Sequence, residues 1–184
     1  VLEHAIKNVD KWTKDEKRPS NVDRPFFIRM LMGLLGSKSY IKYQPLGTVG
    51  VISPWNFPVN LILAPLGGIF AAGNRAMIKP SELTPATSEV TKKMFEAYFD
   101  KSEAAVFTGD AEVGAAFSAL PFDHLLFTGG TQIGKKVMKA ASDNLVPVTL
   151  ELGGKSPVIV DENANLSEVA KKVMRGKTMN AGQI

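Results

Sequence analysis

The sequence predicts an α/β fold in which an open parallel sheet is covered by helices on both faces. Short apolar stretches of about five residues alternate with helical stretches of about ten to fifteen residues, which is the pattern of repeated strand–helix–strand units. The first short stretch, residues 48–53, is β-branched and bounded by glycine and proline, as buried strands often are. The 184 residues, 45% of them hydrophobic and 22% charged, suffice for one globular domain with its own core.

The region before Pro45 has a different character. Apolar residues at helical spacing predict a helix over residues 1–15 that ends at residues 18–20. Residues 25–35 predict a second helix, and the alternation in residues 39–44 predicts an exposed strand. This region is too small to bury a hydrophobic core alone, so we expect it to pack against another part of the protein.

After Pro45 the elements follow in regular order. We expect strands over residues 48–53, 75–79, 104–107, 124–128, 146–150 and 157–160. We expect helices over residues 59–72, 84–99, 111–119, 131–141 and 165–179. Thr84 stands as the N-cap of its helix, with Pro85 at the first helical position.

Composition excludes several function classes. The net charge of +4 comes from cations scattered among acids, which favours a solvated surface over nucleic-acid binding. The sequence has no cysteine and two histidines, so we expect no disulfide, no metal site and no cysteine nucleophile within it. No apolar run reaches the roughly 18–20 residues that span a bilayer, and no signal peptide precedes the charged first residues. We therefore expect a cytoplasmic protein and, because neither end resembles a natural terminus, a fragment.

The turn after the first strand carries a candidate oxyanion donor. Open parallel sheets bind ligands beyond the carboxyl ends of their strands. There, two prolines stiffen Ser53-Pro54-Trp55-Asn56-Phe57-Pro58. The amide of Asn56 could stabilise an oxyanion. The alternative is a turn asparagine that bonds its own backbone.

The turn after the second strand is Lys79-Pro80-Ser81-Glu82. A carboxylate can accept hydrogen bonds from both hydroxyls of a ribose, while an ammonium donates one. A surface salt bridge explains the same spacing equally well.

A glycine turn follows the strand at residues 124–128. Phe127-Thr128-Gly129-Gly130 leads into a helix whose free N–H groups could bind a pyrophosphate. The turn departs from the common dinucleotide fingerprint, because Thr131 replaces its middle glycine.

Glu151 ends the next apolar strand and stands before Gly153-Gly154. A carboxylate beside a mobile glycine turn could swing between positions and act as a general base. The alternative is a glutamate that caps a helix or forms a salt bridge.

Together these segments resemble the NAD(P)-dependent aldehyde dehydrogenases. Pro-Trp-Asn-Phe-Pro (54–58), Lys-Pro-Ser-Glu (79–82), Phe-Thr-Gly-Gly (127–130) and Leu-Glu-Leu-Gly-Gly-Lys (150–155) stand in the order and spacing of that family. The resemblance runs from about Tyr40 to the last residue. It is strongest to the class 3 branch, which includes fatty-aldehyde and coniferyl-aldehyde enzymes, and it leans toward the coniferyl type.

The resemblance implies a Rossmann-like NAD(P)-binding domain over residues 46–184. Residues 1–38 would form an N-terminal helical segment, and residues 39–45 would be part of a strand arm that pairs between subunits of a homodimer or homotetramer. Gly182-Gln183-Ile184 stands where the family has the segment before its nucleophilic cysteine. We therefore expect the cysteine next in a longer chain, the catalytic domain outside this sequence, and no activity from these residues alone.

The resemblance also assigns roles to residues. Asn56 would be the oxyanion amide, and Glu151 would be the base that activates water. NAD would be the cofactor, with NADP as the alternative, and Glu82 would repel a 2′-phosphate. The implied cofactor-binding residues are Ile52, Ser53, Pro54, Trp55, Lys79, Ser81, Glu82, Phe127, Thr128, Gly129, Gly130, Ile133, Leu152 and Gly153.

The implied reaction is oxidation of an aldehyde to the carboxylic acid through a cysteine thiohemiacetal and a thioester. Aromatic aldehydes such as coniferyl aldehyde, or long-chain aliphatic ones, are the expected substrates. A non-catalytic cofactor-binding or structural homologue is the main alternative. A CoA-acylating relative is a further alternative. Glu151 is evidence against it, because hydrolysis needs a base.

Overall fold

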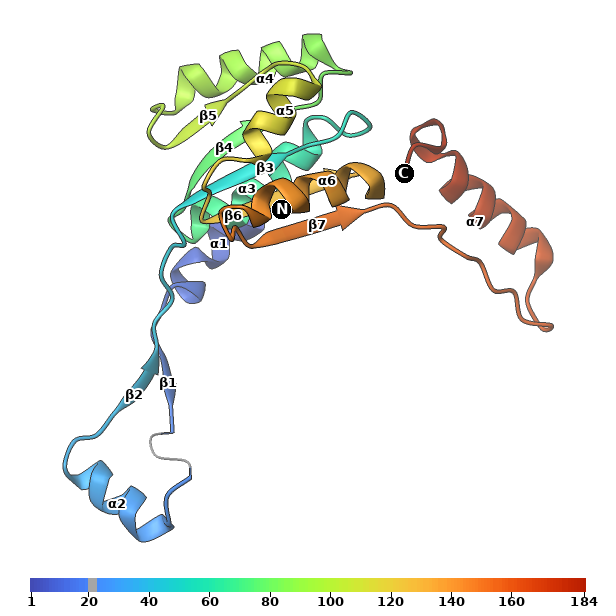
Figure 1. Ribbon diagram of the computed structural model, residues 1–184. Coiled ribbons are helices and arrows are strands. Elements are labelled where there is room, and N and C mark those ends of the chain that lie inside the picture. Colours follow the sequence, from blue (N-terminus) through green and yellow to red (C-terminus); the bar gives the residue numbers. More distant parts are fainter. Residues whose placement is uncertain (20–22) are drawn as a thin grey trace.

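A five-stranded parallel sheet forms the centre of the computed structural model, which describes residues 1–19 and 23–184 (Figure 1). Residues 20–22, at the predicted end of the first helix, lie outside the described residues. The strand order is β5-β4-β3-β6-β7. The bounds are β3 Thr48–Ile52, β4 Arg75–Lys79, β5 Ala104–Val106, β6 His124–Gly129 and β7 Val148–Leu152.

Side chains alternate across the central strand and so divide the core in two. Val49 and Val51 of β3 pack with α3 (Asn60–Ala71) and α4 (Pro85–Tyr98). Ile52 points to the other face, with α5 (Ala111–Ser118) and α6 (Thr131–Ser142). Both faces of the sheet are therefore covered, and the predicted α/β class is confirmed.

The N-terminal helix α1 (Leu2–Trp12) lies against α3. Its Ala5 is buried, and a Cβ at Gly67 of α3 would come within 3.0 Å of the Leu2 side chain. Glycine at this position thus makes room for α1, which leans on the sheet domain as expected. The helix ends three residues before the predicted position, because the chain turns at Thr13.

A hairpin follows α1 and projects from the sheet domain (Figure 1). We call residues 16–42 the N-terminal hairpin; it contains β1 (Glu16–Arg18), α2 (Phe26–Leu34) and β2 (Ser39–Ile41). The two strands pair antiparallel, with Lys17 opposite Tyr40. At the base of the hairpin the Tyr43 hydroxyl donates to Glu16 Oε2 at 3.0 Å, and this bond raises the pKa of Tyr43. The helix and exposed strand expected here are confirmed, whereas β1 was not predicted.

The last part of the chain departs from the prediction at one element. The strand expected over residues 157–160 is not formed, and no strand in the described residues pairs with them. The final helix, α7 (Leu166–Thr178), begins as predicted, and the Asn165 side chain caps it by accepting from the Ser167 and Glu168 amides. A short 3₁₀ turn, η1 (Met179–Gly182), follows. Within the described ranges, no helix is long and apolar enough to cross a membrane.

We expect Gly50→Ala to destabilise the protein. Gly50 lies in the middle of β3, and a Cβ there would stand 2.7 Å from both Leu125 and Phe122 side-chain atoms. Overpacking of this kind costs about 1–3 kcal/mol of unfolding free energy. Urea titration should show an earlier midpoint.

Gly68→Ala in α3 is the matched control, because nothing lies within 4 Å of the added Cβ. Alanine favours a helix over glycine by about 1 kcal/mol, so this variant should unfold no earlier than the parent. Equal midpoints for Gly50→Ala and the parent would show that the sheet relaxes around the extra methyl.

Candidate active site

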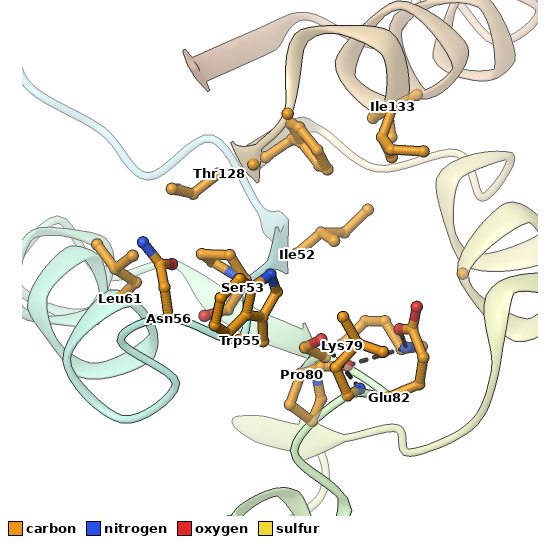
Figure 2. Close-up of a pocket in the computed structure, with 18 of the residues that line it drawn as sticks. Ile52, Ser53, Trp55, Asn56, Leu61, Lys79, Pro80, Glu82, Thr128 and Ile133 are labelled. Carbon is orange, nitrogen blue, oxygen red and sulfur yellow. Dashed lines mark hydrogen bonds and ion pairs between the residues drawn. The ribbon is translucent and has the colours of Figure 1, made fainter. Parts of the chain in front are cut away.

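Four strands of the sheet end at one cavity of about 810 Å³ (Figure 2). Its size lies within the range of small-molecule sites. The cavity brings together every predicted site residue: Ile52, Ser53, Pro54, Trp55, Asn56, Lys79, Ser81, Glu82, Phe127, Thr128, Gly129, Gly130, Ile133, Glu151, Leu152 and Gly153. In the part of the chain that the structure describes, no group of three His, Cys, Asp or Glu side chains is placed to hold a metal ion.

The strand order explains where this cavity lies. From β3 the chain moves outward to β4 and β5, and then crosses back to β6 on the other side of β3. The connection after β3 therefore crosses one face of the sheet, and the connection after β6 crosses the other face. A crevice opens at such a switch point in open α/β sheets, at the carboxyl ends of the strands.

Ser53 is a buried residue of the turn after β3. It is 3% exposed, and its amide donates to the Lys79 carbonyl at 3.1 Å, which continues the pairing of β3 with β4. Its hydroxyl is buried and has no hydrogen-bond partner among the described residues. A buried hydroxyl without a partner is costly, so a ligand in the cavity would be stabilised by bonding to it.

Lys79 is buried and has a carboxylate beside it. The residue is 2% exposed; its Nζ donates to the Pro80 carbonyl at 2.9 Å and lies 3.5 Å from Glu82 Oε2 (Figure 2). The Glu82 side chain is 46% exposed, so the pair joins a buried cation to an accessible carboxylate. An ordinary surface salt bridge has two exposed partners, and this pair differs from it. Glu82 keeps acceptor capacity for a ligand, and the third N–H of Lys79 can donate.

The glycine turn after β6 places a helix end at the cavity. Gly130 is the N-cap of α6, and its carbonyl accepts from the amides of Ile133 and Gly134 at 3.0 Å each. The first N–H groups of a helix have no partner within it and attract anions. A Cβ at Gly134 would come within 2.9 Å of Leu152, so glycine there lets α6 approach β7.

Asn56 and the C-terminal segment are joined by two hydrogen bonds. Asn56 Nδ2 donates to the Gln183 carbonyl at 2.7 Å, and Asn180 Nδ2 donates to the Asn56 carbonyl at 2.8 Å. Asn180 and Ala181 have positive φ angles of 49° and 54°, a region that non-glycine residues rarely adopt. The side-chain amide of Asn56 thus donates a hydrogen bond to the backbone of a segment that is distant in sequence, and not to the backbone of its own turn.

Glu151 lies at the rim of the same cavity. It pairs in register with Thr128 across β6 and β7, and its side chain is exposed. Within the described parts of the chain it forms no ion pair and caps no helix. Its carboxylate is therefore available to water and to a ligand.

The cavity is also lined by residues that the sequence did not predict for the site, among them Asp110, Lys136 and Gln183. Asp110 follows β5 and caps α5 by accepting from the amides of Glu112 at 3.0 Å and Val113 at 3.2 Å. The same rule about strand ends could have found it. Lys136 lies one helical turn after Ile133, so helical spacing pointed to it. The resemblance placed Gln183 in the segment before the nucleophile, but its contact with Asn56, which spans 127 residues, was not predicted.

The comparison with protein families gives one match. The model of the "Aldehyde dehydrogenase family" matches residues 19–184. The match begins before Tyr40, where the resemblance in the sequence became evident.

Similar curated proteins point to the same family. The chain is 58% identical over 183 residues to a probable coniferyl aldehyde dehydrogenase of Caulobacter vibrioides, covering 100% of this chain and 36% of that protein. It is 63% identical over 149 residues to a coniferyl aldehyde dehydrogenase of a Pseudomonas species, covering 81% of this chain and 31% of that protein. A mouse aldehyde dehydrogenase family 3 member B2 is 41% identical over 179 residues, with 97% of this chain and 35% of that protein covered. The chain thus spans about a third of the length of these relatives.

Solved structures share the fold. The substrate-bound state of Staphylococcus aureus AldH superposes with a TM-score of 0.88 at 47% identity, covering 99% of this chain and 38% of that one. A Mycobacterium tuberculosis aldehyde dehydrogenase complexed with NAD⁺ gives a TM-score of 0.83 at 30% identity, covering 99% of this chain and 35% of that one. With the family model over most of its length and the strand-end residues in one cavity, this chain belongs to the aldehyde dehydrogenase family.

Proposed function

We propose that the complete protein oxidises an aldehyde to the carboxylic acid with NAD⁺ as electron acceptor. The observation that carries the proposal is the bond from the Asn56 amide to the Gln183 carbonyl, at a cavity that Glu151 also lines. In the family the nucleophilic cysteine follows the Gly-Gln segment, so an oxyanion donor, a base and the nucleophile would share one cleft.

The residues of the cavity fit a dinucleotide. The N-terminus of α6 would bind the pyrophosphate, and Glu82 with Lys79 would bind the hydroxyls of the adenosine ribose. The Ser53 hydroxyl, which has no partner in the described residues, would gain one from the ligand. Glu82 would repel a 2′-phosphate, which favours NAD over NADP. When bound, the nicotinamide supplies a two-electron acceptor beside the aldehyde carbon.

Two side chains of this chain would act on the reacting groups. Asn56 would turn its amide from Gln183 to the oxygen of the aldehyde, and would hold the negative charge that develops there. Glu151 would accept a proton from the water that releases the acid. Its exposed position beside Gly153 and Gly154 leaves the carboxylate room to move toward that water.

We infer the substrate class and the assembly from the relatives. The coniferyl aldehyde dehydrogenases among them favour an aromatic aldehyde, with long-chain aliphatic aldehydes second. Residues 46–184 would form the cofactor domain after an N-terminal segment over residues 1–38. Residues 39–45 would contribute to pairing between subunits of a homodimer or homotetramer.

The direct test is turnover by the full-length protein. Coniferyl aldehyde with NAD⁺ should give NADH, measured by absorbance, and a panel should rank aromatic and long-chain aldehydes above short ones. A full-length protein that binds NAD⁺ but oxidises no aldehyde of the panel would favour the non-catalytic alternative.

Glu82→Ala should weaken NAD⁺ binding and leave aldehyde binding little changed. Loss of a hydrogen bond to a charged group costs about 1.5–3 kcal/mol, so the KM for NAD⁺ should rise about tenfold to a hundredfold. Steady-state kinetics with NAD⁺ and the aldehyde varied in turn measures the change in the KM for each. Glu89→Ala is the control, because its pair with Lys93 is exposed and lies on the outer side of α4. A larger change in the KM for aldehyde would contradict the ribose contact.

Glu151→Gln should slow release of the acid and spare the step before it. General-base catalysis contributes about 10²–10⁴-fold, so steady-state turnover should fall by that order while the first turnover still gives a burst of NADH. Stopped-flow absorbance separates the two phases. Glu162→Gln, on the exposed segment before α7, should behave as the parent does. A normal burst with an unchanged steady-state rate would remove Glu151 from this role.

A further inference from the structure

The helices α5 and α6 border one end of the cavity. They contact each other and pack on the same face of the sheet. A Cβ at Gly114 of α5 would stand 4.0 Å from Lys79 Cε, so the pair of Lys79 and Glu82 lies beside α5. On the α6 side the lining includes Ile133, Val137 and one cation, Lys136. The end of the cavity that would hold the adenosine is thus bordered by a paired lysine on one side and by a second lysine on the other.

Lys136 is the cation of this cavity that lacks a charged partner. The charged side chains that line the cavity are Lys79, Glu82, Asp110, Lys136 and Glu151. Lys79 is paired with Glu82, and the Asp110 carboxylate accepts from the first amides of α5. In the described part of the chain Lys136 forms no ion pair. Because it lines the space that the cofactor would enter, its ammonium would face an anionic ligand.

The position of Lys136 along α6 places it near the ribose. It lies one helical turn after Ile133, and Figure 2 shows Ile133 on the opposite side of the cavity from Glu82. A helical side chain leans toward the N-terminus of its helix, so the ammonium lies between the first turn of α6 and the apolar space farther along. The pyrophosphate would lie at that first turn and the adenine in the apolar space. Lys136 and Glu82 would therefore approach the ribose between them from opposite sides.

We propose that Lys136 determines the cofactor specificity of the proposed reaction, on whose placement of the dinucleotide this role rests. Its ammonium binds a phosphate on the 2′-hydroxyl of the adenosine ribose, so that the protein accepts NADP⁺ as well as NAD⁺. Such a phosphate carries between about 1.5 and 2 negative charges near pH 7, which Glu82 alone would repel. Lys136 offsets this repulsion with charge-assisted hydrogen bonds. The Glu82 side chain is 46% exposed, so it has room to turn away from the phosphate.

The other parts of the dinucleotide have less need of Lys136. The free N–H groups at the start of α6 already serve the pyrophosphate, and apolar side chains such as Ile133 and Val137 serve the adenine. A 2′-phosphate would have no other unpaired cation of this cavity to contact in the described residues. Contact of Lys136 with the pyrophosphate or the adenine would affect NAD⁺ and NADP⁺ equally, and this difference makes the role testable.

Titration calorimetry of the full-length protein with NAD⁺ and with NADP⁺, without aldehyde, tests the proposal. The parent should bind both dinucleotides. Lys136→Gln should raise the Kd for NADP⁺ about tenfold or more, because a charge-assisted bond is lost, and should raise the Kd for NAD⁺ less than about threefold. Binding of NADP⁺ by the parent should also weaken more steeply with salt than binding of NAD⁺.

Two further variants separate the contact from the overall charge. Lys136→Arg keeps a cation that suits a phosphate, so NADP⁺ should bind within about threefold of the parent. Lys139→Gln removes the same charge from α6 at a residue outside the lining of the cavity, and should bind both dinucleotides as the parent does. Retained NAD⁺ binding also shows that each variant is folded.

Three results would overturn the proposal and leave the proposed function standing. The first is a parent that binds NAD⁺ but not NADP⁺. The second is Lys136→Gln with unchanged affinity for NADP⁺, and the third is an equal loss of affinity for both dinucleotides in that variant. A parent that binds neither dinucleotide would contradict the proposed function as well.

Discussion

The parallel pairing of β3 with both β4 and β6 is the constraint on which the site depends. Ile52 stands opposite Lys79 on one side and Phe127 on the other, so β3 and β4 end at the same level while β6 continues to Gly129. Because the chain reaches β6 only after β4 and β5, the turns after β3 and β6 cannot cover each other. Shifting the register by one residue would turn Ser53 and Lys79 to the opposite faces of the sheet. Backbone pairing in the core thus fixes where the polar groups of the cavity stand.

Burial of Lys79 links the stability of this region to its capacity for ligands. A cation that is 2% exposed is costly without compensation, and the Pro80 carbonyl and the Glu82 carboxylate provide it. Glu82 is therefore held near the cavity even without a ligand. Hydroxyl groups that donate to Glu82 would add bonds to this carboxylate without taking it from the lysine. One carboxylate can thus both balance a buried charge and bind a ribose.

The elements of the sheet domain could be predicted from the sequence because each is indicated by a short run of neighbouring residues. Each strand of the sheet is a short apolar stretch, and most site residues stand in the last positions of one or directly after it. The rule about strand ends therefore brought them together without coordinates. The strand β1 was missed because Glu16-Lys17-Arg18 has neither apolar residues nor alternation. Residues 157–160 have strand composition but pair with no strand in the described part of the chain, and pairing is not a local property. The bond between Asn56 and Gln183 was likewise unpredictable, since it needs the whole fold to bring the two together.

The distribution of charge along the chain also determines which groups would attract a dinucleotide. The net charge of +4 suggested an evenly mixed surface, but residues 16–42 hold all of it and the remainder of the chain is neutral. At about 0.1 M salt, exposed charges are screened beyond roughly 10 Å, so the hairpin acts only on what lies near it. Attraction of an anionic cofactor must therefore come from groups at the cavity itself, namely Lys136 and the N-terminus of α6. Substitution of Lys136 should therefore change the attraction of an anionic cofactor while the charge of the hairpin stays the same.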